Sequence, residues 1–186
     1  MIKKGYAMGK KVLILSASPR RNGNCSLLCQ EFLRGAKDSG NQVEYIFLRD
    51  KKIGYCTACR YCKSHDGKCV QDDDMNEINQ KMLAADVLVL ASPIYYFTVN
   101  GQMKTLIDRT FGLFNRMEHK EMYYIMTSAD VTDDVMDTAL ATFRWFAHFL
   151  PGSVEKGILR AKGFGEAGAV KEHPVMQEAY NLGASV

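Results

Sequence analysis

The stretch KVLILSASPRRNGNCS, Lys11–Ser26, contains the pattern that decides the fold. It opens with a continuous apolar run, Lys11–Ser18, made mostly of valine, isoleucine and leucine. Such a run is typical of a strand that is buried on both faces. A polar loop with one glycine follows, and an amphipathic helical pattern covers Ser26–Ser39. A buried strand, a polar loop and a helix predict the first unit of an α/β sheet.

The same alternation continues to the end of the sequence. Five strand patterns cover Lys11–Ser18, Gln42–Leu48, Asp86–Ser92, Glu121–Ala129 and Ser153–Leu159. The helical patterns cover Ser26–Ser39, a short segment around Met75–Met82, Gln102–Phe114, Thr132–Leu150 and His173–Leu182. This order predicts a parallel sheet with helices on both faces. Five strands favour a flavodoxin-like three-layer sandwich of order 2-1-3-4-5, in which a ligand lies above strands 1 and 3.

Composition narrows the class of protein. The chain has 186 residues, 47% of them hydrophobic and 24% charged, which fits one globular domain with residues 1–9 as an N-terminal tail. A net charge of +3 is too small to indicate nucleic acid or an acidic membrane surface as a partner. No apolar run approaches the ~20 residues of a membrane span, and the N-terminal residues do not predict a secretory signal. We therefore expect a cytoplasmic protein, in which thiols stay reduced.

The loop after the first strand predicts a phosphate site. It offers a guanidinium at Arg20, hydroxyls at Ser18 and Ser26, and amides at Asn22 and Asn24. It opens onto a helix N-terminus, where unpaired N–H groups and the helix dipole favour an anion. The P-loop pattern GxxxxGK[ST] is absent, which argues against nucleotide hydrolysis. The alternative is an ordinary polar turn with a serine cap.

The loop after the third strand is rich in aromatic residues. In SPIYYFTVNG, Ser92–Gly101, the residues Tyr95, Tyr96 and Phe97 are consecutive. A flat heteroaromatic ligand binds to such rings, although a dimer contact or a self-packed loop would also explain them. The fourth strand ends in TSAD, Thr127–Asp130, whose hydroxyls and amides can reach the polar edge of that ligand. A phosphate site and an aromatic platform together predict a cofactor with the shape of FMN.

A second glycine-rich segment does not predict a dinucleotide site. GFGEAG, Gly163–Gly168, satisfies the pattern G-x-G-x-x-G. It follows the last predicted strand, however, and no βαβ unit comes after it. We therefore interpret it as a glycine-rich turn.

Three segments carry a resemblance to a known family: SASPRRNGNCS, SPIYYFTVNGQMKTLIDR and C-x2-C-x2-C…DDM. They resemble the NAD(P)H-dependent FMN reductases of the flavodoxin-like superfamily, and among them the iron–sulfur flavoproteins. The likeness runs from the first strand to about Leu113, and HPVMQEAYNLG near the C-terminus is similar too. It implies FMN bound at a homodimer interface, in a dimer or a dimer of dimers. It also implies reduction by NADH or NADPH and delivery of electrons to quinones, flavins or other small acceptors.

The resemblance assigns two groups of residues to the flavin. The phosphate would be held by Ser18, Arg20, Asn24, Cys25 and Ser26. The ring would be lined by Pro93, Ile94, Tyr95, Tyr96 and Phe97, with Thr127, Ser128, Ala129 and Asp130. Cys25 departs from the family, which commonly has threonine there, and a thiol is a weaker donor than a hydroxyl. No residue has to be catalytic in its own right, because the flavin carries the chemistry.

Four of the six cysteines lie close together, at Cys56, Cys59, Cys62 and Cys69. Their grouping suits a [4Fe–4S] cluster, in which each iron takes one thiolate. A loop of reduced or disulfide-forming thiols is an equal alternative. Zinc fits less well, because the middle cysteine would belong to two knuckles at once. The acidic run Asp72–Asp74 is interpreted as the start of a helix.

These features favour an FMN-dependent NAD(P)H oxidoreductase with a small-molecule acceptor. One alternative is an iron–sulfur flavoprotein that carries electrons through a [4Fe–4S] cluster and is reduced by ferredoxin. Another is an FMN-binding regulatory protein without turnover. The flavin prediction does not depend on the four cysteines.

Overall fold

A computed structural model describes residues 9–186, so the predicted tail lies, apart from Gly9, outside the described residues. Its centre is a parallel sheet of order β2-β1-β3-β5-β6. The strands are β1 (Lys11–Ser16), β2 (Gln42–Phe47), β3 (Val87–Tyr95), β5 (Glu121–Thr127) and β6 (Val154–Ala161). The predicted fold class and strand order are thereby confirmed. One short strand was not predicted: β4 (Thr98–Val99) pairs antiparallel with the end of β3.

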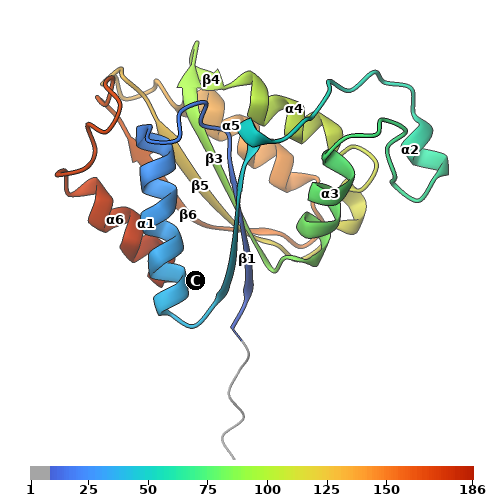
Figure 1. Ribbon diagram of the computed structural model, residues 1–186, viewed down its shortest axis with the longest axis horizontal. Helices are drawn as coiled ribbons and strands as arrows, with labels where there is room; N and C mark the ends of the chain where they lie inside the picture. Colours follow the sequence, from blue (N-terminus) through green and yellow to red (C-terminus); the bar gives the residue numbers. More distant parts are fainter. Residues whose placement is uncertain (1–8) are drawn as a thin grey trace, which may run out of the picture.

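Helices cover both faces of the sheet (Figure 1). One face carries α1 (Asn24–Asp38) and α6 (Val175–Ala184), and the other carries α3 (Met75–Ala84), α4 (Gly101–Arg109) and α5 (Asp137–His148). Three short helices lie in connections: η1 (Leu48–Asp50), α2 (Tyr61–Ser64) and η2 (Phe114–Arg116). Within residues 9–186, no helix combines the length and apolar character that crossing a membrane requires.

The strands alternate their side chains between two hydrophobic cores. In β1, Leu13 and Leu15 pack toward α3, α4 and α5, whereas Val12 and Ile14 pack toward α1 and α6. Successive side chains of a strand point to opposite faces, so a strand covered on both sides needs apolar residues at every position. This is the physical reason for the continuous apolar run at Lys11–Ser18.

The ends of several elements differ from the prediction. Helix α4 ends at Arg109, not Phe114, and Phe111, within the predicted helix, is 42% exposed. Helix α5 begins at Asp137, not Thr132, because the carboxylate of Asp130 accepts hydrogen bonds from the N–H and hydroxyl of Thr132, both 2.9 Å, and holds that segment in a turn. In each case the apolar periodicity continues beyond the helix itself.

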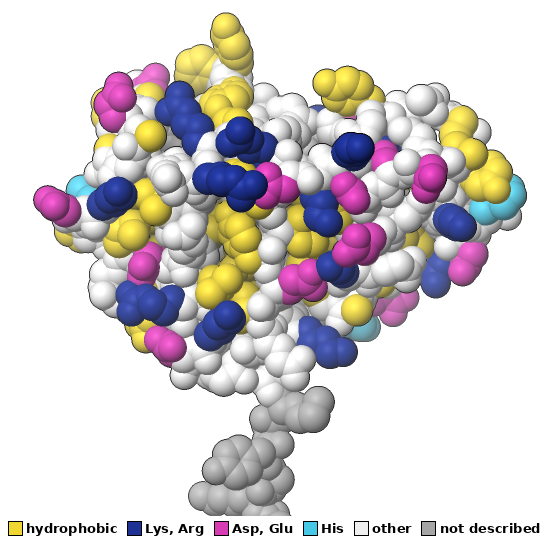
Figure 2. Space-filling model, viewed as in Figure 1, with side chains coloured by type: hydrophobic (Ala, Val, Ile, Leu, Met, Phe, Trp, Pro, Cys, Tyr) yellow, Lys and Arg dark blue, Asp and Glu magenta, His cyan; other side chains and the backbone are white. Residues whose placement is uncertain are grey.

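The β3–β4 hairpin projects beyond the carboxyl edge of the sheet, and Figure 2 shows hydrophobic side chains on its tip. Its two turn residues have positive φ angles, 50° at Tyr96 and 63° at Phe97. Two consecutive residues in this region are typical of a type I′ hairpin turn, which usually contains Asn-Gly. Aromatic residues in this conformation are strained, and the strain lies at the predicted ring site.

Candidate functional site

Three loops meet at the carboxyl ends of β1, β3 and β5, where the winding of the sheet reverses. We call them the β1 loop (residues 17–23), the β3 loop (residues 93–97) and the β5 loop (residues 127–132). These are the loops in which the sequence predicted the cofactor residues. The carboxyl edge at such a reversal is where open α/β sheets bind ligands.

The β1 loop is folded tightly around one carbonyl group. The carbonyl oxygen of Arg20 accepts hydrogen bonds from Ser18 Oγ (2.9 Å), Ser26 Oγ (2.9 Å) and the N–H of Gly23 (3.1 Å). A Cβ at Gly23 would lie only 3.0 Å from Cβ of Arg20, so a side chain at this position would crowd the turn. The two serine hydroxyls that were predicted to bind phosphate therefore also shape the loop.

Helix α1 starts without a side-chain cap. Its N-cap is Gly23, and the first intrahelical hydrogen bond runs from Leu27 N–H to the Gly23 carbonyl (3.0 Å). The N–H groups of Asn24, Cys25 and Ser26 are therefore the donors of the first turn, and they carry the positive end of the helix dipole. Together with the exposed Arg20 they fit an anionic group such as a phosphate.

The side chains of Asn24 and Cys25 point away from that position. Asn24 Nδ2 donates to the carbonyl oxygens of Phe164 and Glu166, both 2.9 Å, and its Oδ1 accepts from the N–H of Gly168 (3.0 Å). Cys25 is buried in the core beside Cys29, and its hydrogen bond to Cys29 and its burial raise its pKa well above the ordinary value. For both residues, only the backbone N–H is left to bind an anion.

The glycine-rich turn, residues 163–168, belongs to this edge. Besides Asn24, it is held by hydrogen bonds from Phe164 N–H to the Ser128 carbonyl (2.9 Å) and from Gly163 N–H to the Asp130 carbonyl (3.1 Å). It therefore ties the β1 loop to the β5 loop. The sequence identified it as a turn but did not place it here, because the contacts span more than 140 residues.

The β5 loop contains two buried hydroxyl residues and one exposed acidic residue. Thr127 and Ser128 are buried, whereas Ala129 and Asp130 are exposed. Ser128 Oγ accepts a hydrogen bond from Asp130 N–H (3.0 Å). The hydrogen bonds from Thr132 lower the pKa of Asp130. Asp130 therefore stays ionised at the edge of the site.

The aromatic rings of the β3 loop are exposed on the surface of the domain. Tyr95 is 46% exposed, Tyr96 98% and Phe97 57%, while Pro93 and Ile94 are half-buried. These exposed fractions, above all that of Tyr96, argue against the self-packed loop that was one alternative. Contact with a flavin or with a second chain stays a prediction.

A residue that the sequence analysis missed joins the β1 and β3 loops. Asn100 is 3% exposed; its Nδ2 donates to the Ala17 carbonyl (2.6 Å), and its N–H donates to Ser92 Oγ (3.1 Å). Its Oδ1 accepts from Met103 N–H (3.1 Å) and so caps α4. An asparagine directly before Gly101 at a predicted helix start is an N-cap pattern, and that signal was present in the sequence. A cleft of about 360 Å³ opens beside this junction.

The four clustered cysteines lie in what we call the cysteine loop, residues 54–71, which extends beyond α3 and α4 (Figure 1). Cys56 and Cys59 are exposed, Cys62 and Cys69 are half-buried, and all four line one cavity of about 860 Å³ together with aromatic residues of α5 and of the segment after α4. Within residues 9–186, no three His, Cys, Asp or Glu side chains are gathered so as to hold a metal ion. Zinc needs all its ligands around one ion, whereas each iron of a [4Fe–4S] cluster takes one thiolate. The donor set thus fits a cluster better than zinc.

The chain is similar to known flavoproteins. Residues 10–154 match the family of NADPH-dependent FMN reductases. An iron–sulfur flavoprotein of Archaeoglobus fulgidus is 41% identical over 113 residues, which are 61% of this chain and 51% of that protein. Another, of Methanocaldococcus jannaschii, is 43% identical over 100 residues, 54% of this chain and 51% of that protein. The chain spans about half the length of these relatives.

Solved structures share the fold over nearly the full length of the chain. The NAD(P)H:quinone oxidoreductase from Methanothermobacter marburgensis superimposes with a TM-score of 0.76, at 16% identity, over 95% of this chain and 96% of that one. An azoreductase from Bacillus anthracis gives a TM-score of 0.74 at 16% identity, over 95% of this chain and 100% of that one. The family match covers most of the sheet and all the loops described above except the glycine-rich turn. The chain therefore belongs to the family of NADPH-dependent FMN reductases.

Proposed function

We propose that the protein binds FMN at the three loops and uses it to oxidise NADH or NADPH, passing the electrons to a quinone, a free flavin or another small acceptor. One observation carries the proposal. Asn100 joins the β1 loop to Ser92, just before the β3 loop, and Asn24 binds the glycine-rich turn, which is itself hydrogen-bonded to the β5 loop, so that the three loops form one edge. This edge has an anion-binding helix start at one end and exposed aromatic rings at the other. The family match supports it.

The phosphate of FMN would bind at the start of α1. The N–H groups of Asn24, Cys25 and Ser26 would donate to its oxygens, and Arg20 would supply the positive charge. Ser18 and Ser26 act on this site by fixing the carbonyl of Arg20, which sets the path of the loop.

The flavin ring would lie between the β3 and β5 loops. Pro93 to Phe97 would contact its apolar face and edge, and residues 127 to 130 its polar edge. Bound FMN accepts a hydride and releases electrons. The chain's own part is to orient the ring through backbone groups, and to exclude water from it with the rings of Tyr95 and Phe97.

The proposal is tested by adding FMN to flavin-free protein and following flavin fluorescence, then adding NADH or NADPH under anaerobic conditions. We expect saturable binding, bleaching of the visible flavin bands by a pyridine nucleotide, and return of the colour when a quinone is added. Protein that ignores FMN contradicts the proposal. Protein that binds FMN but is not reduced would instead support the regulatory alternative.

A second candidate function is that of an iron–sulfur electron carrier reduced by ferredoxin. The observation that favours it is that Cys56, Cys59, Cys62 and Cys69 line one cavity. It requires about four irons per chain after anaerobic purification, bound by one thiolate each. Cys59→Ser should then lose the iron while FMN binding is kept. Cys29→Ser is a control, because Cys29 is buried in the core away from this cavity. Iron-free protein after anaerobic purification contradicts this candidate.

We also propose that the chain assembles as a homodimer or a dimer of dimers. In support, Phe111, Trp145 and Phe149 are 42%, 65% and 59% exposed around one cavity beside α5. Large exposed apolar patches mark interaction surfaces. Light scattering coupled to size exclusion gives the mass, and a monomer at micromolar concentration would contradict the assembly.

A further inference from the structure

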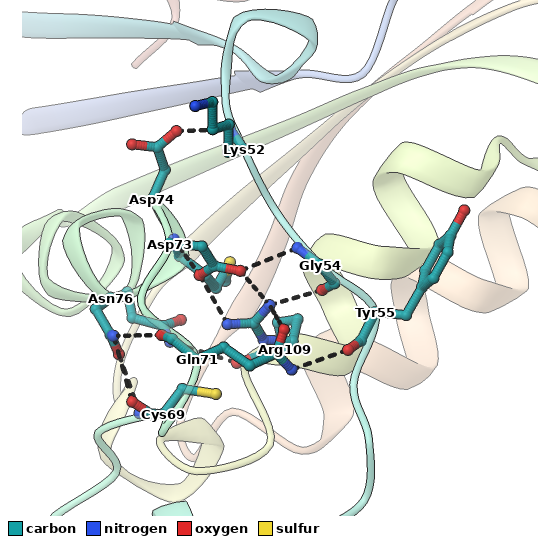
Figure 3. A network of polar contacts seen from close by, with 11 residues as sticks. Lys52, Gly54, Tyr55, Cys69, Gln71, Asp73, Asp74, Asn76 and Arg109 are labelled. Carbon is teal, nitrogen blue, oxygen red and sulfur yellow. Dashed lines mark hydrogen bonds and ion pairs between the residues drawn. The ribbon is translucent and has the colours of Figure 1, made fainter.

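Both ends of the cysteine loop meet at one buried arginine (Figure 3). Arg109 is the last residue of α4, and its side chain is 1% exposed. Its Nη1 donates to the carbonyl oxygen of Gly54 (2.6 Å), where the loop begins, and to Oε1 of Gln71 (3.2 Å), where it ends. One guanidinium therefore holds two segments that are 17 residues apart in the sequence.

Asp73 completes this closure. Its Oδ2 and Oδ1 accept from Nη1 (2.7 Å) and Nη2 (2.8 Å) of Arg109, the two-pronged geometry that suits a guanidinium and a carboxylate. The same carboxylate accepts from the N–H groups of Gly54 (2.9 Å) and Met75 (3.1 Å). The acidic run was predicted only to begin a helix. The structure shows that Asp73 accepts a hydrogen bond at the start of α3, whose N-cap is Asp74, and also binds the loop and α4.

Further hydrogen bonds fix the base of the loop around Cys69. The N–H of Cys69 donates to Oδ1 of Asn76 (3.0 Å), and Nδ2 of Asn76 donates to the Gln71 carbonyl (3.2 Å). Nε2 of Gln71 donates to the Tyr55 carbonyl (2.9 Å), which joins the two ends directly. Nε of Arg109 has no hydrogen-bond partner among the described residues.

The part of the cysteine loop around residues 56–60 is exposed, unlike the base. Cys56 and Cys59 are exposed, and the backbone takes positive φ angles at Ala58 (55°) and Arg60 (60°). The loop thus has a hydrogen-bonded base that contains the half-buried Cys69, and an arm that carries the exposed Cys56 and Cys59.

We propose that Arg109 is the positioning residue of the cysteine loop: with Asp73 it closes the base and fixes Cys69 at the cavity that all four cysteines line, without help from a ligand. The ion pair is almost entirely buried, and removing one partner of such a pair leaves an uncompensated charge. Asn100 anchors the opposite end of α4, roughly 13 Å away, so the closure and the flavin edge are held by different residues. The inference therefore stands apart from the proposed function.

The test is hydrogen–deuterium exchange, read by mass spectrometry on flavin-free Arg109→Met. We expect peptides from residues 53–75 to exchange at least about tenfold faster than in the wild type. Peptides from β1, β3 and β5 should exchange as before, and the affinity for FMN should not change. The loop contains its own trypsin sites at Arg60, Lys63 and Lys68, and cleavage there should accelerate in parallel.

Arg116→Met is the matched control. Arg116 also binds the cysteine loop, at the carboxylate (2.6 Å) and carbonyl (3.0 Å) of Asp66, but the Asp66 side chain is 91% exposed. This variant should exchange like the wild type. Arg109→Lys keeps the charge but cannot reach Gly54, Gln71 and Asp73 together, and should be intermediate.

If Arg109→Met does not fold, Asp73→Asn and Arg109→Lys are judged by the same criterion. Exchange that stays at the wild-type rate in residues 53–75 overturns the proposal. Exchange that rises equally across the sheet also overturns it, because Arg109 would then support the core in general and not the loop.

Discussion

Two arginines that are neighbours in sequence are predicted to differ in function. Arg21 forms an ion pair with Asp50 (2.7 Å), whereas Arg20 is exposed beside the start of α1 and makes no ion pair within residues 9–186. We expect Arg20→Ala to weaken FMN binding about tenfold to a hundredfold, the loss of one charge-assisted contact to phosphate. Arg21→Ala is the control and should bind FMN like the wild type. Equal affinities of all three proteins in a fluorescence titration would remove Arg20 from the site.

Asp73 predicts a dependence of stability on pH. Burial raises its pKa, but hydrogen bonds from Arg109, Gly54 and Met75 outweigh this effect and hold the pKa below the ordinary value. A depressed pKa stabilises the folded state above the unfolded pKa of about 3.9, and the stabilisation is lost as the pH falls through the folded pKa. We expect Asp73→Asn to lower the free energy of unfolding by about 3 kcal/mol at pH 6.

Urea unfolding at several pH values measures this effect. The difference between wild type and Asp73→Asn should shrink as the pH drops below about 4, where the unfolded chain begins to bind a proton at Asp73, and should be smallest below the depressed pKa of the folded protein. A difference that stays constant with pH would show that the carboxylate charge does not stabilise the fold.

Asn24 should stabilise the carboxyl edge of the sheet. Its side chain is 8% exposed and makes three hydrogen bonds to the glycine-rich turn. We expect Asn24→Ala to lower the free energy of unfolding by about 1–3 kcal/mol, because three backbone groups of the turn lose their partner. Asn22→Ala, an exposed amide in the same loop, is the control. Equal urea midpoints for the two variants would contradict this role.

Among the secondary-structure elements, the β3–β4 hairpin has a strained backbone at the same residues that are predicted to contact the flavin ring. Tyr96 and Phe97 hold the two positive-φ positions of its turn, where Asn-Gly is preferred. We expect the double variant Tyr96→Asn, Phe97→Gly to raise the stability of the flavin-free protein by about 1 kcal/mol and to weaken FMN binding. Urea unfolding and FMN titration measure the two effects. A more stable protein with unchanged FMN affinity would place the rings outside the flavin site.

The interior of the elements could be predicted from sequence, and their ends could not. The runs in β1, β3 and β5 are apolar at nearly every position because both faces of the sheet are covered, and this signal is local. Helix α4 ends earlier than its periodicity suggests. The chain after it packs on the cysteine loop, where a Cβ at Gly112 would lie 2.8 Å from Cβ of Cys62. That contact joins segments about 50 residues apart, and no local pattern announces it.

In the candidate site, too, local patterns could be predicted from sequence and long-range contacts could not. The sequence located the three loops, because they follow apolar strands whose order has one reversal point. It did not reveal that Asn24 binds the glycine-rich turn, that Asn100 joins two loops, or that Arg109 closes the cysteine loop. These are hydrogen bonds between polar side chains and distant backbone groups, and any asparagine or arginine on the surface has the same local sequence signal.

Across residues 9–186, the two sets of predicted redox groups lie in different parts of the fold. The flavin loops lie at the carboxyl edge of the sheet, and the cysteine loop lies beside α3 and α4 (Figure 1). Helix α4 connects them, with Asn100 anchoring one end and Arg109 the other. This arrangement predicts that FMN binding survives changes in the cysteine loop, and that the loop stays ordered in the flavin-free protein.

The decisive measurement is an anaerobic absorption spectrum of the FMN-loaded protein before and after addition of NADH or NADPH. We expect the visible flavin bands to bleach with one of the two nucleotides and to return when a quinone is added. We also expect the same behaviour for Cys59→Ser. Protein that takes up no FMN, or whose bound FMN is reduced by neither nucleotide, would contradict the proposed oxidoreductase function.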